Sequence, residues 1–501
     1  MEENNKISNG VKKLLIFVAF AAGYLIMSLE LLGFRLLAPY FGYSIYVWGS
    51  LIGLILAALA AGYYLGGWLA EKKPGAKTIQ NLFSGTAVFL LIILFVYQPI
   101  LKYLSDWGVI WGALAATFLI FLLPMIFLAA VSPIVIKILS HQEKTGYWAG
   151  LVYAWATLGS LLGTFLAAFI LIPYLGSRLT LYSCFFLALV IFVVIILAAG
   201  QRKMLWLGLL FFISLPALYP KQPPAGILLE TESLYNQIRL IDTEKFILLT
   251  LNSQRHNLSQ SAYVKQGTLV NLSLIDLFNL GPLISPVREL LVLGMAGGAS
   301  VRQHQQYAPQ ARIDAVEIDP KIIEIARTRF GIQASDSLKI YEADARPFLA
   351  QSQKKYDMIE IDLFQGSPYL PFYVATREFF QSAFKHLNPS GLIMMNVYAP
   401  GKKEILTPIL ATISSVFPSV YTIPISDNFM VVASRSVIDS DAIKEKIKNS
   451  SRTNSPDLKL AADYALDFIK PYQADKKAPV FSDDWAPVEL ITYQMLKNLN
   501  F

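Results

Sequence analysis

Small and acidic residues in the C-terminal half of the chain have types and spacing suited to chemistry. Gly294, Ala296 and Gly298 follow the apolar run LLVL, which is typical of a buried parallel strand. Small residues at this point let the backbone approach a ligand at the start of the next helix. Glu317 lies 23 positions after Gly294, near the spacing of about 20 residues at which an acid accepts hydrogen bonds from ribose hydroxyls. The pattern predicts a pocket for a nucleoside.

Two more acids end later strand-like runs. Asp344 follows LKIYEA, and Asp362 follows YDMIEI. The carboxyl ends of parallel strands open into one crevice that binds ligands, so we expect these acids to lie together. The alternatives are solvated strand-end acids for Glu317 and Asp344, and a loop-capping acid for Asp362. The Gly-x-Ala-x-Gly turn differs from the Gly-x-Gly-x-x-Gly turn of NAD sites and looks more like a class I methyltransferase-type site for S-adenosylmethionine.

The elements that position these residues form an α/β pattern. Apolar strand-like runs alternate with helix-like segments, and LLVLG, ARIDAVEID and GLIMMNVY are the first, second and fifth strands. This alternation predicts a class I methyltransferase-like, Rossmann-like domain over 285–437, followed by a C-terminal extension over 438–501. Ahead of it, GILLETESLYNQIRLIDTEKFILLTLN alternates as strands do and predicts a small antiparallel β subdomain over 221–284.

The first part of the chain has a composition suited to lipid rather than water. The 501 residues are 55% hydrophobic and only 15% charged, whereas soluble proteins carry about 25% charge, and charges are sparse from Leu14 to Leu218. A spanning helix needs about 20 apolar residues, so we expect an α-helical transmembrane bundle over 1–220. The candidate spans are 14–33, 47–69, 82–101, 109–139, 148–172 and 179–199, with a shorter run at 205–219.

Basic residues predict a cytoplasmic N-terminus, because cytoplasmic loops carry the excess of lysine and arginine. One set of loops holds Lys6, Lys12, Lys13, Lys72, Lys73, Lys77, Lys137, Lys144, Arg202 and Lys203, and the other holds Arg35, Lys102 and Arg178. Six crossings return the chain to the cytoplasm, and seven would leave the C-terminal half outside. The run 205–219 covers only about 22 Å as a helix, short of the hydrocarbon core of about 30 Å, so we interpret it as re-entrant or interfacial.

Three features inside the predicted spans bear on packing. Residues 62–66 (GYYLG) and 159–163 (GSLLG) are small-xxx-small faces for close helix contact. Pro124 and Pro133 predict a kink in the fourth run. Glu30 and, shortly after it, Arg35 are either a functional site or an ion pair that pins two helices.

Composition also argues against several function classes. The net charge of +7 comes without a basic cluster interleaved with aromatics, so we expect no nucleic-acid partner. Cys184 is the one cysteine, which excludes a disulfide within the chain and a cysteine-rich metal site. The four histidines are scattered without metal-ligand spacing, so we expect no metal.

The motifs resemble the spermidine synthase (polyamine aminopropyltransferase) family. The resemblance lies in VLGMAGGASVRQH, AVEIDPKIIEIARTRFGI, YEADARPFL and YDMIEIDLF, and in ESLYNQIRL and LTLNSQRHN ahead of them. The segments LELLGFRLLAPYFGYSIYVWGS, AAGYYLGGWLAE, VYAWATLGSLLG and FSDDWAPVEL resemble the branch in which a multi-pass membrane domain is fused to the synthase-like domain.

The resemblance implies roles for individual residues. Glu317 would bind the ribose, and Asp344 the adenine amino group. The turn at 294–298 would pass under the side of the bound nucleoside that carries the thioether or sulfonium sulfur. Asn236 occupies the position of a glutamine near the nucleoside, and Asp362 begins the loop that closes over the reacting centre.

The sequence departs from the family at positions that matter for the reaction. Gly297 stands where the soluble enzymes have an aspartate that meets the aminopropyl ammonium. Gln365 stands at the catalytic position that a second aspartate holds in the soluble enzymes. The soluble enzymes also have a glutamine at the position of His256, and Gln254 does not align with that glutamine. An attacking amine must be neutral, so a positioned carboxylate helps to deprotonate it. Asp362 could serve as the base alone, with His256 or Tyr369 assisting.

Three functions are consistent with these residues. The first is a membrane-integrated transferase whose co-substrate is decarboxylated S-adenosylmethionine or S-adenosylmethionine, with no tightly bound cofactor; the resemblance implies aminopropyl transfer to putrescine or a related amine. The second is methyl transfer onto a lipid-soluble or membrane acceptor. The third is a transporter or sensor with a nucleoside-binding domain. Because the donor is made in the cytosol, we expect the catalytic domain on the cytoplasmic side of the cell membrane. The sequence leaves open whether the protein forms a homo-oligomer. Asp483 and Asp484 either reach the pocket or cap the fold.

Overall fold

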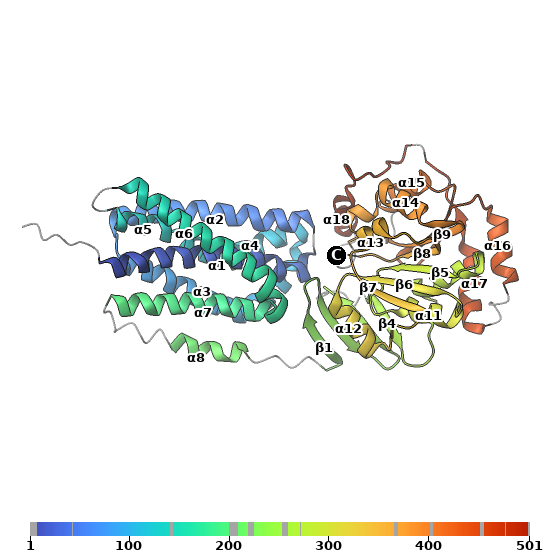
Figure 1. The fold of residues 1–501 in the computed structure, drawn as a ribbon, viewed down its shortest axis with the longest axis horizontal. Helices are drawn as coiled ribbons and strands as arrows, with labels where there is room; N and C mark the ends of the chain where they lie inside the picture. The colour runs from blue at the N-terminus through green and yellow to red at the C-terminus, as the bar shows by residue number, and fades with distance from the viewer. Residues whose placement is uncertain are drawn as a thin grey trace, which may run out of the picture. The chain divides into compact units, whose positions relative to one another are not determined.

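The chain divides into two compact units in the computed structural model, Met1–Gln222 and Pro223–Phe501 (Figure 1). The structure describes residues 8–42, 44–140, 144–199, 209–218, 225–252, 259–270, 272–364, 369–400, 404–450, 455–475 and 477–498.

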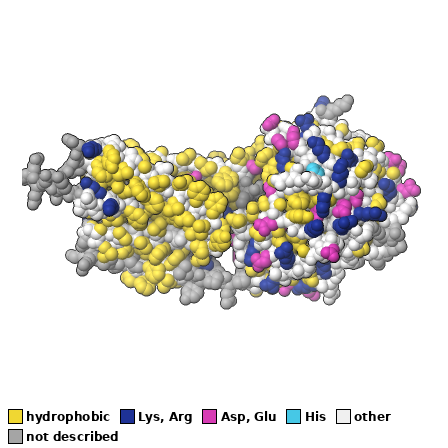
Figure 2. All heavy atoms as spheres, viewed as in Figure 1, with side chains coloured by type: hydrophobic (Ala, Val, Ile, Leu, Met, Phe, Trp, Pro, Cys, Tyr) yellow, Lys and Arg dark blue, Asp and Glu magenta, His cyan; other side chains and the backbone are white. Residues whose placement is uncertain are grey.

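The secondary-structure elements described in the first unit are all helical. Apolar side chains cover most of its visible face, whereas charged side chains are scattered over the visible face of the second unit (Figure 2). The elements are α1 (Asn9–Phe41), α2 (Ile45–Lys72), α3 (Ala76–Leu104), η1 (Ser105–Trp107), α4 (Val109–Ala129), α5 (Val131–Leu139), α6 (Thr145–Leu166), η2 (Ala167–Leu171), α7 (Ile172–Ala198), α8 (Leu210–Ser214) and η4 (Leu215–Leu218).

Five helical stretches among the described residues are long and apolar enough to cross a membrane. The last stretch, Thr145–Ala198, has 54 residues and corresponds to two predicted spans. Gly176 interrupts it with non-helical dihedral angles of φ 77° and ψ 172°, so two helices meet there. Ala130 separates α4 from α5, between Pro124 and Pro133. Pro133 lacks an N–H, and its ring clashes with the carbonyl four residues earlier, which is a physical reason for the helix assignment to break at this point.

The predicted small-xxx-small faces lie at the tightest helix contacts. A Cβ on Gly159 would lie 1.9 Å from the Phe20 carbonyl oxygen, and one on Gly163 would lie 2.4 Å from the Tyr24 carbonyl oxygen, both across the contact between α6 and α1. A Cβ on Gly66 would lie 2.5 Å from the Ala130 carbonyl oxygen, between α4 and α5. Only glycine lets the backbones approach this closely, so the prediction from both motifs is confirmed.

The remaining predictions for this unit stay open. Glu30 and Arg35 are both partly buried on α1, and their role stays a prediction. Of the short run at 205–219, the structure describes 209–218, and 210–218 form the five-residue α8 and the four-residue η4. Residues 205–208 and 219 lie outside the described residues.

The second unit begins with a four-stranded antiparallel sheet in the order β1-β2-β3-β4. Its strands are β1 (Ile227–Glu232), β2 (Gln237–Asp242), β3 (Phe246–Leu251) and β4 (Ser261–Val264). The predicted small antiparallel sheet is therefore present.

The main sheet has eight described strands in the order β12-β10-β11-β9-β8-β5-β6-β7, and neighbouring strands from β9 to β7 are parallel. The five predicted strands correspond to β5 through β9, so the Rossmann-like α/β domain is confirmed. The antiparallel edge was not predicted. The strands are β5 (Glu289–Leu293), β6 (Arg312–Glu317), β7 (Leu338–Glu342), β8 (Tyr356–Ile361), β9 (Leu387–Tyr398), β10 (Ser419–Ile425), β11 (Asn428–Ser434) and β12 (Lys470–Pro471).

Helices cover both faces of this sheet (Figure 1). Leu290 and Val292 of β5 pack in one apolar cluster and Leu291 and Leu293 in another, because successive side chains of a strand point to opposite faces. The helices are α9 (Leu274–Leu277), η5 (Phe278–Leu280), α10 (Gly281–Ile284), α11 (Ala299–Tyr307), α12 (Pro320–Arg329), α13 (Ala345–Gln351), η6 (Phe372–Val374), α14 (Arg377–Lys385), α15 (Leu406–Ser414), α16 (Ser440–Asn449), α17 (Pro456–Phe468) and α18 (Val488–Asn498).

We expect Gly159→Leu to destabilise the helical unit by about 3 kcal/mol, because overpacking against a backbone carbonyl forces the helices apart. Gly150→Leu is the matched control, since a Cβ on Gly150 of the same helix meets nothing within 4 Å. Thermal unfolding of the detergent-purified protein is the measurement. Equal melting temperatures for the two variants would show that the α1–α6 contact is not tight.

Candidate functional site

The glycine turn after β5 has backbone angles that favour small residues. Gly294, Ala296 and Gly298 all have positive φ, of 88°, 47° and 80°. A Cβ on Gly294 would lie 2.2 Å from the Asp362 carbonyl oxygen, so a side chain is excluded there. Gly298 is the N-cap of α11. The turn therefore runs directly against the end of β8, where Asp362 lies.

Glu317 holds this turn through both carboxylate oxygens. Its Oε2 accepts the Ala296 N–H at 2.9 Å, and its Oε1 accepts the Asp319 N–H at 3.0 Å. The side chain ends β6 and is buried. Burial raises the pKa of Glu317 to about 7, while these backbone hydrogen bonds oppose the rise. A carboxylate can accept about four hydrogen bonds, so capacity for the two ribose hydroxyls is left.

Asp319 joins the small sheet to the main sheet. It is fully buried, and its Oδ2 accepts hydrogen bonds from Ser233 Oγ and, at 2.8 Å, from Asn236 Nδ2. Asn236 Oδ1 in turn accepts from Asn252 Nδ2 at 2.7 Å. The structure thus places Asn236 beside the end of β6, in a hydrogen-bond network with Asp319 and Asn252.

Sequence reasoning gave Asp319 no role, although a signal was present. Its Oδ1 accepts the Lys321 N–H at 3.0 Å and caps α12. The pair Asp319–Pro320 is a helix-start signature, because aspartate favours the N-cap and proline the first helical position.

Asp344 follows β7 and caps α13, where its Oδ1 accepts the Arg346 N–H at 3.0 Å. Burial and the neighbouring Asp344 raise the pKa of Tyr373 to about 12. Burial, followed by the carboxylates of Asp319, Glu342 and Asp344, raises the pKa of Tyr235. Tyr235 is 39% exposed and lies near these acids.

Asp362 lies immediately after β8, where Asn396 Nδ2 donates to its Oδ1 at 2.9 Å. Burial raises the pKa of Asp362 to about 7, Asn396 lowers it, and the nearby Glu360 raises it. A carboxyl group with a pKa near neutrality is suited to general base catalysis. Glu360 itself pairs with His304, with 2.8 Å between Oε2 and Nε2. That pair could not be found from the sequence, because its members are 56 positions apart.

The sheet order brings these residues to one edge. Asp362, Gly294, Glu317 and Asp344 lie at or just beyond the carboxyl ends of the consecutive neighbours β8, β5, β6 and β7. Three strand spacings amount to about 14 Å, which suits a nucleoside with a short sulfonium side chain. The predicted gathering of strand-end acids therefore agrees with the topology.

A side chain on Gly297, such as the aspartate of the soluble enzymes, would displace neighbouring side chains. A Cβ there would lie 2.9 Å from both Phe330 Cε1 and Ser261 Oγ. Gln365, His256 and Gln254 lie outside the described residues. Within the described residues, no group of three or more potential metal ligands occurs.

The C-terminal segment is anchored beside Asp344. Arg346 Nη1 donates to Asp483 Oδ1 at 2.9 Å and to the Tyr373 carbonyl oxygen at 2.8 Å. This ion pair lowers the pKa of Asp483. Asp484 is exposed. Of the two alternatives for the tail, the contacts of Asp483 agree with a structural cap.

Comparison with known proteins identifies this domain. Residues 276–436 match the spermine/spermidine synthase domain family. A probable polyamine aminopropyl transferase of Bifidobacterium longum is 30% identical over 278 residues, which are 52% of this chain and 61% of that protein. Polyamine aminopropyltransferase 2 of Aquifex aeolicus is 23% identical over 468 residues, which are 89% of this chain and 92% of that protein. The human eEF1A lysine and N-terminal methyltransferase is 32% identical over 145 residues, or 26% of this chain and 20% of that protein.

The second unit therefore carries a spermine/spermidine synthase domain, and the chain is related to transferases of the polyamine aminopropyltransferase type. The similarity to the Aquifex protein extends over most of both chains, so it includes the helical unit. The alignment with the Bifidobacterium protein covers less than two thirds of that relative.

We expect Glu317→Gln to weaken the binding of S-adenosylhomocysteine or methylthioadenosine at least about tenfold, since hydrogen bonds to a charged acceptor contribute about 1.5–3 kcal/mol. The native carboxyl group is protonated below its pKa of about 7. Native affinity should therefore fall as the pH falls from 8 to 6, and the variant should lose this dependence. Calorimetry at both pH values is the measurement. Glu324→Gln, on the exposed face of α12, is the matched control, and unchanged affinity in the Glu317 variant would remove the ribose assignment.

Proposed function

We propose that this protein is a membrane-integrated aminopropyltransferase that uses decarboxylated S-adenosylmethionine and putrescine or a related amine. The observation that carries the proposal is the pair of acids on one sheet edge, with Glu317 bound to the glycine turn and Asp362 against it. The names of the relatives support the same reaction. Glu317 would hold the ribose, Asp344 the adenine edge and Asn236 the network beside them.

In the transfer step, the nitrogen of a neutral amine attacks the sulfonium-linked carbon of the aminopropyl group. A C–N bond forms, the C–S bond breaks, and its electron pair stays on sulfur, which leaves as a neutral thioether. Asp362 accepts the proton that the amine loses. Its pKa of about 7 matches this task at neutral pH, and Asn396 orients the carboxylate through Oδ1. Gln365 would assist only through hydrogen bonding, because an amide is not a base at neutral pH.

Methyl transfer from S-adenosylmethionine to a lipid-soluble or membrane acceptor is the second candidate. Gly297 favours it, because it supplies no carboxylate to bind the aminopropyl ammonium, and a side chain there would displace Phe330 and Ser261. The human methyltransferase among the relatives gives independent support. The two candidates share the adenosyl pocket and differ in the donor side chain.

We propose further that the helical unit lies in the cell membrane with both termini in the cytoplasm. The helical stretches are long and apolar enough to cross, and the break at Gly176 allows the last of them to cross twice. Both candidate donors are made in the cytosol, so the catalytic unit needs access to that side.

We expect calorimetry of the full-length protein to show tighter binding of decarboxylated S-adenosylmethionine than of S-adenosylmethionine. With putrescine, the products should be spermidine and methylthioadenosine, detected by mass spectrometry. Preference for the intact donor would favour methyl transfer. Binding without turnover of any amine or membrane acceptor would favour a sensor.

The Asp362→Asn variant separates catalysis from binding when the same two measurements, product formation and calorimetry, are applied to it. Turnover should fall by about 10²–10⁴-fold, the usual contribution of a general base, while binding of methylthioadenosine stays. Gln365→Ala should leave nucleoside binding intact. Full turnover in the Asp362 variant would assign the proton transfer to another group.

A reporter fused after Phe501 should be active only on the cytoplasmic side, because six crossings return the chain there. A fusion after Leu104, at the end of α3, should report the opposite side and serves as the matched control. A periplasmic signal after Phe501 would rule out the proposed topology and the use of a cytosolic donor.

A further inference from the structure

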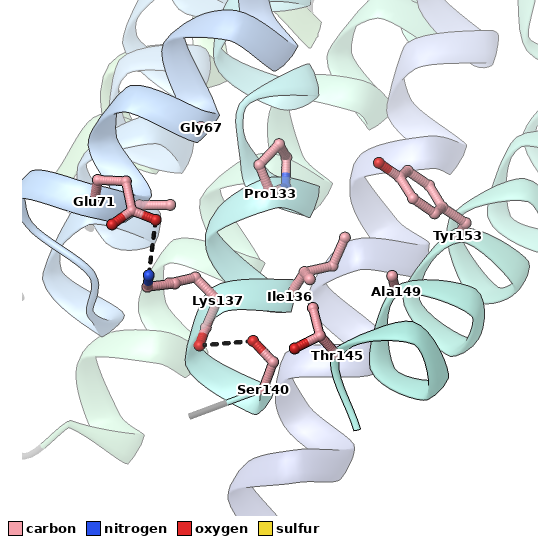
Figure 3. A pocket seen from close by; sticks show the side chains of 10 residues that line it. Gly67, Glu71, Pro133, Ile136, Lys137, Ser140, Thr145, Ala149 and Tyr153 are labelled. Atoms are coloured by element: carbon pink, nitrogen blue, oxygen red, sulfur yellow. Dashed lines mark hydrogen bonds and ion pairs between the residues drawn. The ribbon is translucent and has the colours of Figure 1, made fainter. Parts of the chain in front are cut away.

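An open surface cavity of about 570 Å³ lies on the helical unit, where the ends of three helices meet (Figure 3). Glu71 comes from the last turn of α2, Lys137 from the last turn of α5, and Thr145 is the first residue of α6. The 28 residues of α2 make a helix about 42 Å long, close to the bilayer thickness of about 40–45 Å with headgroups included. If α2 crosses the bilayer, the cavity lies at headgroup level.

Opposite charges stand side by side in this cavity. Lys137 Nζ lies 2.7 Å from Glu71 Oε1, and the two side chains are 42% and 71% exposed. An ion pair this exposed contributes little to stability. Each member can therefore exchange its partner for a ligand group of opposite charge.

The surroundings of the pair suit an amphipathic molecule. The hydroxyl groups of Thr145 and Tyr153 point into the cavity (Figure 3), and Ile136 and Ala149 supply apolar wall. The N-cap of α6, Lys144, makes no side-chain cap hydrogen bond. N–H groups in the first turn of a helix are suited to phosphate binding.

We propose that this cavity binds the headgroup of a bilayer phospholipid that carries both a primary ammonium and a phosphate, as phosphatidylethanolamine does. The ammonium donates hydrogen bonds to Glu71, and the phosphate accepts them from Lys137 and from the start of α6. A headgroup with a phosphate alone would place a second anion beside Glu71. A quaternary ammonium has no N–H to donate. The inference rests on the proposed membrane placement and is independent of the transfer reaction.

The test compares lipids that differ only in the headgroup. Full-length protein is equilibrated with equal amounts of phosphatidylethanolamine, phosphatidylcholine and phosphatidylglycerol of the same chain length, and bound lipid is counted by native mass spectrometry. Phosphatidylethanolamine should be retained roughly tenfold over the other two, the ratio expected from one charge-assisted hydrogen bond. Glu71→Gln and Lys137→Gln should each remove this preference.

Two controls keep the outcome unambiguous. Lys102→Gln removes an exposed lysine from the last turn of α3 and should leave the preference unchanged. The double exchange of Glu71→Lys with Lys137→Glu keeps an ion pair and therefore controls for folding, and it should also lose the preference, because it places a carboxylate where the phosphate binds. Equal retention of the three lipids, a preference for phosphatidylglycerol, or a preference that survives both glutamine substitutions would overturn the proposal. Release of the protein from membranes by alkaline carbonate would instead contradict the membrane placement and would leave adenosyl binding untouched.

Discussion

The carboxylate of Glu317 holds the candidate site together, because its two oxygens accept backbone N–H groups from Ala296 and from Asp319. The first of these belongs to a turn with positive φ at a non-glycine residue, a conformation that needs support from its surroundings. The second belongs to the residue that starts α12. One buried side chain therefore fixes both the glycine turn and the start of the helix beside it.

In the proposed function, the same carboxylate also accepts hydrogen bonds from the ribose hydroxyls, so its ionisation state affects ligand binding. Burial raises the pKa of Glu317 to about 7, as it does for Asp362. Two acids that titrate near neutrality on one sheet edge make the pocket sensitive to pH. A bound donor with a positive sulfonium favours the ionised form of both groups, because opposite charges lower the pKa of a carboxyl group.

The two units use different physics to pack. In the main sheet, apolar side chains of alternate orientation fill two clusters, one on each face, as expected for a fold driven by the hydrophobic effect. In the helical unit, Gly159 and Gly163 let backbones approach. Close van der Waals contact drives helix association in lipid, where apolar burial offers no gain between helices. The exposed apolar face of this unit in Figure 2 is consistent with that environment.

The sequence by itself determined the periodic and local features: the apolar spans, five parallel strands, the glycine turn, and the acids at 317, 344 and 362. These follow from period and spacing along the chain, which one sequence carries. Only the tertiary structure decided which groups meet across long separations. The bonds from Asn236 and Ser233 to Asp319, from Asn396 to Asp362, and from Glu360 to His304 join residues that no local pattern pairs. It also decided that Gly297 is crowded by Phe330 and Ser261, because steric space and burial depend on neighbours that folding alone brings together.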